Sequence, residues 1–177
     1  NAFRLLTHQF NGRRKGGFVL TYSTLASIVK YPYSALYAGN KSKVGFFMTE
    51  AADYRKIADE LGIICLSNQG QTLKYVRHPL VYLVEAADDI CYQLMDIEDA
   101  FKLKILTLDE TINLMMKFIP EEKRFRIHEI FKLVNDQNEQ IAYLRSNVIG
   151  RLINECVKVF VDNEEKILSG TFEGSLI

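Results

Sequence analysis

The stretch that decides the predicted fold is Arg77–Ala100, RHPLVYLVEAADDICYQLMDIEDA. Pro79 sits where a helix can begin, because the N–H that proline lacks would have no partner inside the helix. After Pro79 the stretch contains no glycine and no further proline, and good helix formers fill its middle. Apolar residues recur at gaps of four and three, at Leu80, Val84, Ala87, Cys91 and Leu94. The pattern predicts one long helix that buries this stripe in the core.

A second face of the same helix is polar. Residues four apart differ by about 40° around a helix axis, so one face collects Glu85, Asp88, Tyr92 and Asp96. Like charges at this spacing destabilise a helix, and carboxylates are natural ligands of hard divalent cations. Two interpretations follow: a solvated acidic surface, or a site for a bound cation. The apolar residues on both sides predict a helix buried on most sides, and a buried carboxylate needs a partner.

Sequence patterns typical of helices also occur in the rest of the chain. Pro32 is expected to end a helix that starts near Thr21, because proline cannot donate the next hydrogen bond. Thr49 is expected to cap a helix that runs to about Leu61 and stops at Gly62. The short apolar run at 63–66 is interpreted as a connection, because its length does not separate strand from helix.

The second half of the chain predicts three more helices. Thr107 and Glu110 form a capping-box pattern, and Pro120 opens the next helix. A last long helix begins at Gln137 or Asn138. Its apolar stripe is Ile141, Leu144, Val148, Leu152, Cys156 and Val159, long enough for a subunit contact as well as core. The fold class predicted from these patterns is all-α.

Composition describes one globular domain. The 177 residues are 48% hydrophobic and 25% charged, and the formal net charge is zero. A neutral chain does not indicate nucleic acid as a partner, and no apolar run reaches the roughly 20 residues of a membrane span. The three cysteines are odd in number and lie far apart, at Cys65, Cys91 and Cys156. We interpret them as buried free thiols, and we expect a cytoplasmic location.

Several blocks of the sequence resemble one known family. EAADDICYQLMDIEDA, preceded by RHPL, is similar to the carboxy-terminal metal-aspartate helix of the deoxyguanosinetriphosphate triphosphohydrolases, the dGTPase-like branch of the HD-domain phosphohydrolases. NAFRLLT, LTYSTLASIVKYP, VGFFMTEAADYRKIADELG and the closing ILSGTFEGSLI resemble further family segments in the same order. The resemblance implies a partial HD-domain-like bundle, with residues 1–177 as a single helical domain from the middle to the C-terminal part of such an enzyme.

The resemblance implies roles for the polar face of the central helix. The family places a Tyr four residues and an Asp eight residues after its metal-binding Asp, and this register selects Asp88, Tyr92 and Asp96 rather than Asp89. Asp89 points about 100° away from that face. Asp88 would ligate a divalent metal such as Mg²⁺ or Mn²⁺, Tyr92 would lie against the deoxyribose, and Asp96 would accept a hydrogen bond from the 3′-hydroxyl. Asp88 is therefore expected in a polar cavity.

Three further residues are implied to bind the nucleotide. Lys30 and Tyr31 match a family Lys-Tyr-Pro motif near the phosphates, and Asn1 matches a family Asn at the same place. A Lys at the end of a helix also complements the helix dipole, so a structural role for Lys30 stays open. The basic loop at 11–17, NGRRKGG, lacks the phosphate-loop pattern and is interpreted as a surface connection.

The chain lacks the other metal ligands that the family uses. A family site holds its metal with one His, an adjacent His-Asp pair and the later Asp, but none of the three histidines, His8, His78 and His128, is followed by Asp. His78 is expected to fix the start of the central helix. The chain is therefore interpreted as a fragment of a metal-dependent enzyme that hydrolyses a deoxynucleoside triphosphate to deoxynucleoside and triphosphate. The isolated fragment is predicted to be inactive.

Two other functions remain open at this point. One is a non-catalytic module that binds deoxynucleoside triphosphates (dNTPs) or mediates oligomerisation, and the other is a helical interaction domain with no ligand. The partners expected from the resemblance are a dNTP and further copies of the chain in a homo-oligomer, without a membrane.

Overall fold

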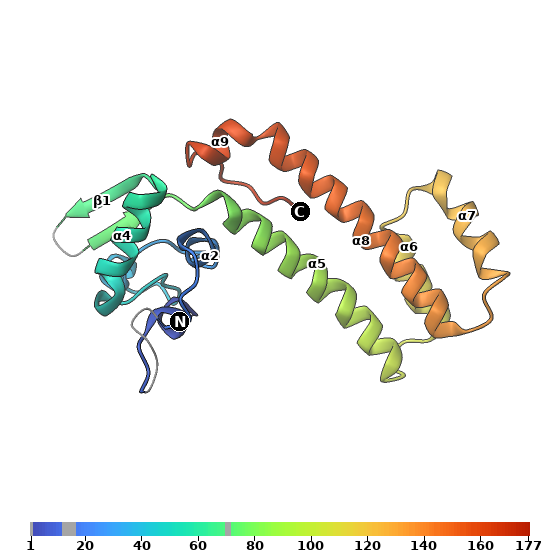
Figure 1. The fold of residues 1–177 in the computed structure, drawn as a ribbon. Coiled ribbons are helices and arrows are strands. Elements are labelled where there is room, and N and C mark those ends of the chain that lie inside the picture. Colours follow the sequence, from blue (N-terminus) through green and yellow to red (C-terminus); the bar gives the residue numbers. More distant parts are fainter. Residues whose placement is uncertain (1, 12–16, 70–71) are drawn as a thin grey trace. The chain divides into compact units, whose positions relative to one another are not determined.

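A computed structural model describes residues 2–11, 17–69 and 72–177. Figure 1 shows helices throughout this part of the chain and one small hairpin. The described chain forms two compact units: the first runs to Glu85 and takes in Asn163–Ser175, and the second comprises Ala86–Asp162 with Leu176–Ile177. The all-α prediction is confirmed as a mostly helical fold with one two-stranded sheet.

The first unit joins short helices to a β-hairpin. Its helical elements are α1 (Ala2–Thr7), α2 (Tyr22–Ser27), α3 (Ala35–Ala38), the 3₁₀ helix η1 (Met48–Glu50), α4 (Ala51–Leu61), α9 (Glu164–Leu168) and the first turns of α5 (Pro79–Lys102). Strands β1 (Cys65–Gln69) and β2 (Thr72–Tyr75) pair antiparallel, with Ser67 opposite Lys74. The connection predicted at 63–66 is therefore wrong from Cys65 onward. A short apolar run does not show by itself whether it forms a strand, and pairing with β2 makes this one a strand. Gly62 ends α4 in the left-handed conformation, as predicted.

Aromatic side chains form the core of the first unit. The ring of Tyr54 stacks on Phe46 at 4.4 Å between centroids and meets the edges of Phe3 and Tyr75 at 5.5 and 5.3 Å. All four side chains are at most 3% exposed. Through this cluster, α1, α4 and β2 pack against the segment around Phe46, so the first unit has a hydrophobic core of its own.

The hydroxyl of Tyr54 has a testable consequence. It is buried without a hydrogen-bond partner among the described residues, and burial raises the pKa of this phenol. An unsatisfied buried hydroxyl costs about 1–3 kcal/mol, so Tyr54→Phe is expected to leave the free energy of unfolding unchanged or to raise it by about 1 kcal/mol.

Tyr82→Phe is the matched control, because the Tyr82 hydroxyl donates to the Phe172 carbonyl at 2.9 Å. That variant is expected to lose about 1 kcal/mol. Urea unfolding of both variants checks the prediction, and a loss at Tyr54 equal to that at Tyr82 would contradict it.

The second unit is built from long helices. It contains α5 from Ala86 onward, α6 (Leu108–Met116), α7 (Glu121–Phe131) and α8 (Gln137–Asp162). The capping box at Thr107 and Glu110 is confirmed, with both of its hydrogen bonds present. Five members of the stripe predicted for α8 are buried as expected, namely Ile141, Leu144, Val148, Leu152 and Cys156, whereas Val159 is only partly buried. α8 returns alongside the second half of α5 (Figure 1). The Arg145 side chain of α8 donates a hydrogen bond to the Glu98 carboxylate of α5.

Two other features of the described residues bear on the sequence interpretation. Among the described helices, none is both long and apolar enough to cross a membrane. The cysteines are free, but only Cys156 is buried, whereas Cys65 and Cys91 are exposed. The expectation of three buried thiols is therefore wrong at two positions. Cys65 lies between Ile64 and Leu66, which are themselves exposed, and Cys91 lies on the exposed side of α5 although its neighbour Ile90 is buried.

Candidate functional site

The polar face of α5 is formed as the spacing predicts. No break interrupts α5 between Pro79 and Lys102, so Asp88, Tyr92 and Asp96 lie in successive turns on one face. His78 fixes the start of the helix: its Nδ1 accepts a hydrogen bond from the Leu80 N–H at 3.2 Å. Burial lowers the pKa of His78, which favours the neutral ring that can accept this bond.

The burial expected for α5 is wrong in the described chain. Asp88 and Asp96 are exposed, and the Tyr92 side chain is 64% exposed. Of the predicted apolar stripe only Leu94 is buried. The residues that α5 does bury are Val81, Tyr82, Ala86, Ile90 and Leu94. The helix is apolar around most of its circumference, so periodicity alone could not choose the buried side.

Two of the helix carboxylates are neutralised by cations from elsewhere in their own unit. Glu85 pairs with Lys30 at 2.6 Å and also accepts a hydrogen bond from Arg77. Glu98 pairs with Lys102 at 2.8 Å and with Arg145. Burial raises the pKa of Glu98, but hydrogen bonds from these two cations outweigh it and the net shift is downward.

The remaining acids of the face lack such partners. Across residues 2–11, 17–69 and 72–177, neither Asp88 nor Asp96 makes an ion pair. The tyrosine between them also lies open to solvent. These side chains therefore remain available to a ligand.

Lys30 and Tyr31 lie in a segment whose backbone is hydrogen-bonded to neighbouring segments of the first unit on two sides. On one side the Pro32 carbonyl accepts from the Tyr75 N–H of β2 at 2.9 Å. On the other side the Gly45 N–H donates to the Tyr33 carbonyl at 3.1 Å. A Cβ at Gly45 would lie only 2.1 Å from the Tyr31 carbonyl oxygen, so this close approach requires glycine. The Lys-Tyr-Pro and Gly-Phe-Phe blocks therefore meet in space.

This segment lines a cleft of about 460 Å³ in the first unit. Basic side chains at its wall are Lys30, Lys74 and Arg77, and acidic ones are Glu85 and Glu173. Its aromatic walls include Tyr31, Tyr33, Tyr82 and Phe172. The Arg77 guanidinium lies over the Tyr82 ring at 4.7 Å, and the Phe172 ring meets the edge of Tyr82 at 5.3 Å. A cleft that holds several cations and flat rings suits a phosphate-bearing ligand, once Lys30 and Arg77 are released from Glu85.

Glu85 is expected to stabilise the first unit by joining two cations. Its side chain is 18% exposed, and Glu85→Gln removes the charge that compensates Lys30 and Arg77. We expect a loss of about 1–2 kcal/mol in the free energy of unfolding, since the Lys30 side chain is 48% exposed and screened by solvent. Urea unfolding measures the effect. Glu173→Gln is the matched control at the same cleft, and an equal midpoint for the two variants would contradict the prediction.

Among the described residues, the sequence offers one candidate ligand for the expected metal site. Asp88 offers carboxylate oxygens of the kind that Mg²⁺ or Mn²⁺ takes. Within the described part of the chain, no three or more His, Cys, Asp or Glu side chains are grouped to hold a metal ion. The His8 ring packs against Phe10 at 4.9 Å, and His128 is exposed on α7. The histidines therefore do not complete the donor set.

Some features of the candidate site were not predicted from the sequence, and others lie outside the described residues. Asn1 lies outside the described residues, and the loop at 11–17 is described only at its two ends. Arg77 and Phe172 received no role from the sequence, although each lies inside a block that resembles the family. Glu85 was placed on the polar face, but its partners Lys30 and Arg77 were not foreseen because no local spacing joins them.

Known proteins resemble this chain over almost its whole length. No protein-family model matches the chain. A deoxyguanosinetriphosphate triphosphohydrolase-like protein of Pseudomonas aeruginosa is 33% identical over 184 residues, covering 99% of this chain and 40% of the relative. One of the same name from Synechocystis is 33% identical over 187 residues, with the same coverage of each protein. A deoxyguanosinetriphosphate triphosphohydrolase of Yersinia enterocolitica is 27% identical over 180 residues, covering 89% of this chain and 34% of the relative.

The chain thus spans about 40% of the length of the first two of these relatives. The relatives carry the same family name that the sequence blocks suggested. The resemblance is thereby confirmed: almost the entire chain is homologous to one part of the deoxyguanosinetriphosphate triphosphohydrolase-like proteins.

Proposed function

We propose that the full-length protein is a metal-dependent dNTP triphosphohydrolase of the dGTPase type and that this chain contributes one wall of its active site. The observation that carries the proposal is the register of Asp88, Tyr92 and Asp96 on one open face of an unbroken helix. The names of the relatives support a hydrolase of this type. The proposed cofactor is a divalent metal ion such as Mg²⁺ or Mn²⁺, with Asp88 as its one ligand from the described residues.

The sugar of the substrate is assigned to Tyr92 and Asp96. A flat phenol ring that lies against the deoxyribose leaves no room for a 2′-hydroxyl. The Asp96 carboxylate accepts a hydrogen bond from the 3′-hydroxyl, and a sugar that lacks this donor leaves a desolvated acceptor without a partner. Such a loss costs about 1–3 kcal/mol, which is enough to discriminate between sugars.

The phosphates are assigned to Lys30 and Tyr31, together with Asn1. The positions of Lys30 and Arg77 at the cleft of the first unit support this assignment. Each cation interacts with phosphate oxygens in place of the Glu85 carboxylate, so Glu85 holds the two side chains in position until the substrate arrives.

The proposed reaction is hydrolysis at the α-phosphorus. The oxygen of water bonds to this phosphorus, the bond to the 5′-oxygen breaks, and that oxygen leaves with a proton as the deoxynucleoside hydroxyl. The other product is inorganic triphosphate. The residues of this chain bind and orient the sugar and the phosphates, and such positioning supplies much of the rate in phosphoryl transfer.

The 177-residue chain alone is expected to release no triphosphate from dGTP. The described residues lack a complete set of metal donors, and one carboxylate does not fix a divalent ion. Triphosphate release is measured with Mg²⁺ and with Mn²⁺, and the full-length protein is the matched control. Turnover by the isolated chain would contradict this prediction, and an inactive full-length protein would contradict the proposed function.

The absence of a grouped donor set also supports a second candidate. In the part of the chain that the structure describes, the cleft around Lys30 lacks metal donors in a group yet has cations and aromatic rings. A non-catalytic module that binds a dNTP or joins subunits needs no more than this. Binding of dGTP by the full-length protein without any release of triphosphate would favour the module over the enzyme.

A further inference from the structure

Tyr82 joins two parts of the first unit that are far apart in the sequence. Its side chain is 3% exposed. The Arg77 guanidinium lies over its ring at 4.7 Å from the centroid. Its hydroxyl donates a hydrogen bond at 2.9 Å to the carbonyl of Phe172, which is 90 residues further along the chain. One buried side chain therefore contacts both a cation of the cleft and the C-terminal segment, defined here as residues 170–172.

The C-terminal segment is itself held in place. The N–H groups of Thr171 and Phe172 both donate to the Lys166 carbonyl, at 2.8 and 3.1 Å, so the chain turns back directly after α9. Gly170 has a φ of +74°, and a Cβ there would lie 2.4 Å from Cγ1 of Val76, the residue after β2. This close approach therefore requires glycine. Both Gly170 and Phe172 line the cleft, so the segment forms a fixed part of its wall.

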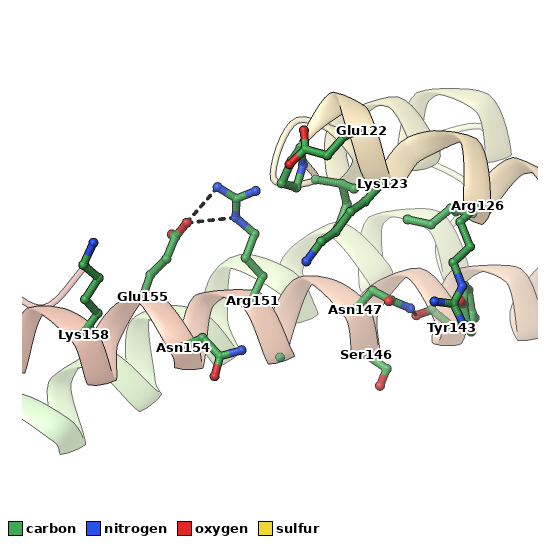
Figure 2. Close-up of a pocket in the computed structure, with 14 residues that line it drawn as sticks. Glu122, Lys123, Arg126, Tyr143, Ser146, Asn147, Arg151, Asn154, Glu155 and Lys158 are labelled. Atoms are coloured by element: carbon green, nitrogen blue, oxygen red, sulfur yellow. Dashed lines mark hydrogen bonds and ion pairs between the residues drawn. The ribbon is translucent and has the colours of Figure 1, made fainter.

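Arg77 is held differently from an arginine of the second unit. In the groove between α7 and α8, Nε and Nη2 of Arg151 both bond the Glu155 carboxylate, at 2.9 and 2.8 Å (Figure 2). Two nitrogens that bond one carboxylate fix the orientation of a guanidinium. Arg77 bonds Glu85 through Nη2, but its Nε is buried without a hydrogen-bond partner among the described residues. Glu85 alone therefore does not fix Arg77, and the Tyr82 ring supplies a second contact.

The contact with the ring can persist when the hydrogen-bond partner of Arg77 changes. This inference rests on the proposed function, in which phosphate oxygens take the place of the Glu85 carboxylate. A cation–ring contact uses the flat face of the guanidinium and leaves its N–H groups, which lie in the plane, available to the phosphate. Once Glu85 is displaced, the Tyr82 ring remains to hold the guanidinium at the cleft.

We propose that Tyr82 is a positioning residue for the phosphate-binding part of the site and that it acts through Arg77. The ring holds the guanidinium at the cleft while phosphate replaces Glu85, and the hydrogen bond to the C-terminal segment holds the ring. Tyr82 does not itself bond the phosphates. Its removal is therefore expected to weaken substrate binding and to leave the chemical step unchanged, which is the signature of binding shared by ground state and transition state.

The test compares substitutions of Tyr82 in the full-length protein. Steady-state hydrolysis of dGTP with Mg²⁺ gives KM and kcat, and calorimetry in EDTA gives the dissociation constant of dGTP without turnover. Tyr82→Leu removes the ring and the hydroxyl, and we expect binding at least about tenfold weaker with kcat within about twofold. Tyr82→Phe keeps the ring, and we expect binding only about threefold weaker.

Tyr54→Phe is the matched control, because it removes a buried phenol hydroxyl of the same unit outside the cleft. Its binding of dGTP is expected to stay within about twofold of the wild type. The thermal midpoint shows that each variant is folded at the assay temperature. Unchanged KM and dissociation constant in Tyr82→Leu would overturn the proposal.

Arg77→Gln tests whether Tyr82 acts through Arg77. Alone, this substitution is expected to weaken dGTP binding about tenfold or more, because a charge-assisted contact is lost. Tyr82→Leu added to Arg77→Gln is expected to weaken it by less than about twofold further, since the ring then has no guanidinium to hold. A purely structural role of Tyr82 predicts effects that multiply, and that result would overturn the proposal.

Gly170→Ala tests the support from the C-terminal segment without changing Tyr82. The added Cβ collides with Val76 and displaces the segment, so binding is expected to weaken about threefold, as in Tyr82→Phe. Gly62→Ala is the matched control: Gly62 has a φ of +66°, but a Cβ there meets no atom within 4 Å. Equal affinities of the two glycine variants would overturn the role of the segment.

The same measurements separate this inference from the proposed function. A full-length protein that binds dGTP with the expected order of affinities but releases no triphosphate would contradict the hydrolase and support the role of Tyr82. Normal turnover with no effect of Tyr82→Leu would contradict the role of Tyr82 alone. A protein that neither binds nor hydrolyses dGTP would overturn both.

Discussion

Asp88→Ala in the full-length protein is expected to lower the rate of dGTP hydrolysis by about 100-fold or more. Removing even an outer-shell partner of a metal site commonly costs about 10–100-fold in affinity or activity, and Asp88 is the carboxylate assigned to direct ligation. The side chain is exposed and makes no ion pair within the described residues, so the substitution is not expected to affect folding. Triphosphate release at saturating Mg²⁺ or Mn²⁺ measures the effect.

Asp89→Ala is the matched control for this prediction. Asp89 is the next residue on α5, it is exposed, and it carries the same charge, but its side chain points about 100° away from that of Asp88. We expect its rate to stay within about threefold of the wild type, as for an exposed charge outside the site. Titration of the divalent ion adds a second readout, because only Asp88→Ala is expected to weaken metal binding. Equal effects of the two substitutions would show that general acidity, not ligation, matters on this face.

Elements with strong local signals could be predicted from the sequence. α8 begins at Gln137 as expected, and its buried stripe was visible as a regular repeat of apolar residues over several turns. The capping box at Thr107 depends only on residues three apart in the sequence. In both cases the information lies within the element itself, so no knowledge of the tertiary fold was needed.

The buried side of α5 could not be predicted in the same way. Apolar residues surround this helix, and burial depends on which neighbours are present to cover it. Val81 and Leu94 are buried, whereas Leu80 and Val84 are 40% and 39% exposed. The hairpin after α4 was missed for a similar reason, since a short apolar run becomes a strand only when it pairs with another strand across the turn. Tertiary contacts, rather than local preference, settled both cases.

The candidate site shows the same division. The alignment of Asp88, Tyr92 and Asp96 follows from helical spacing alone, so the sequence sufficed to place them on one face. The ion pairs of Glu85 with Lys30 and Arg77 depend on how the first unit folds back on itself. Long-range partners of this kind leave no periodic trace in the sequence.

The largest loss of stability is expected from Leu144→Ala, in the middle of α8. The Leu144 side chain is 0% exposed, and truncation of a fully buried leucine removes transfer free energy and leaves a cavity. Such substitutions cost about 2.7–5.0 kcal/mol, a large part of the roughly 5–15 kcal/mol by which a whole domain is stable. The urea midpoint of the second unit is therefore expected to fall steeply, and the native fraction near 37 °C with it.

Ile153→Ala on the same helix separates packing from helix propensity. Ile153 is 49% exposed, and alanine is the better helix former, so the free energy of unfolding is expected to change by less than about 1 kcal/mol. If the two compact units unfold in separate transitions, Leu144→Ala should shift only the transition of the second unit. Glu85→Gln should then shift only the transition of the first. Equal midpoints for Leu144→Ala and Ile153→Ala would mean that α8 does not bury Leu144, and the packing of the second unit would have to be redrawn around a different face of that helix.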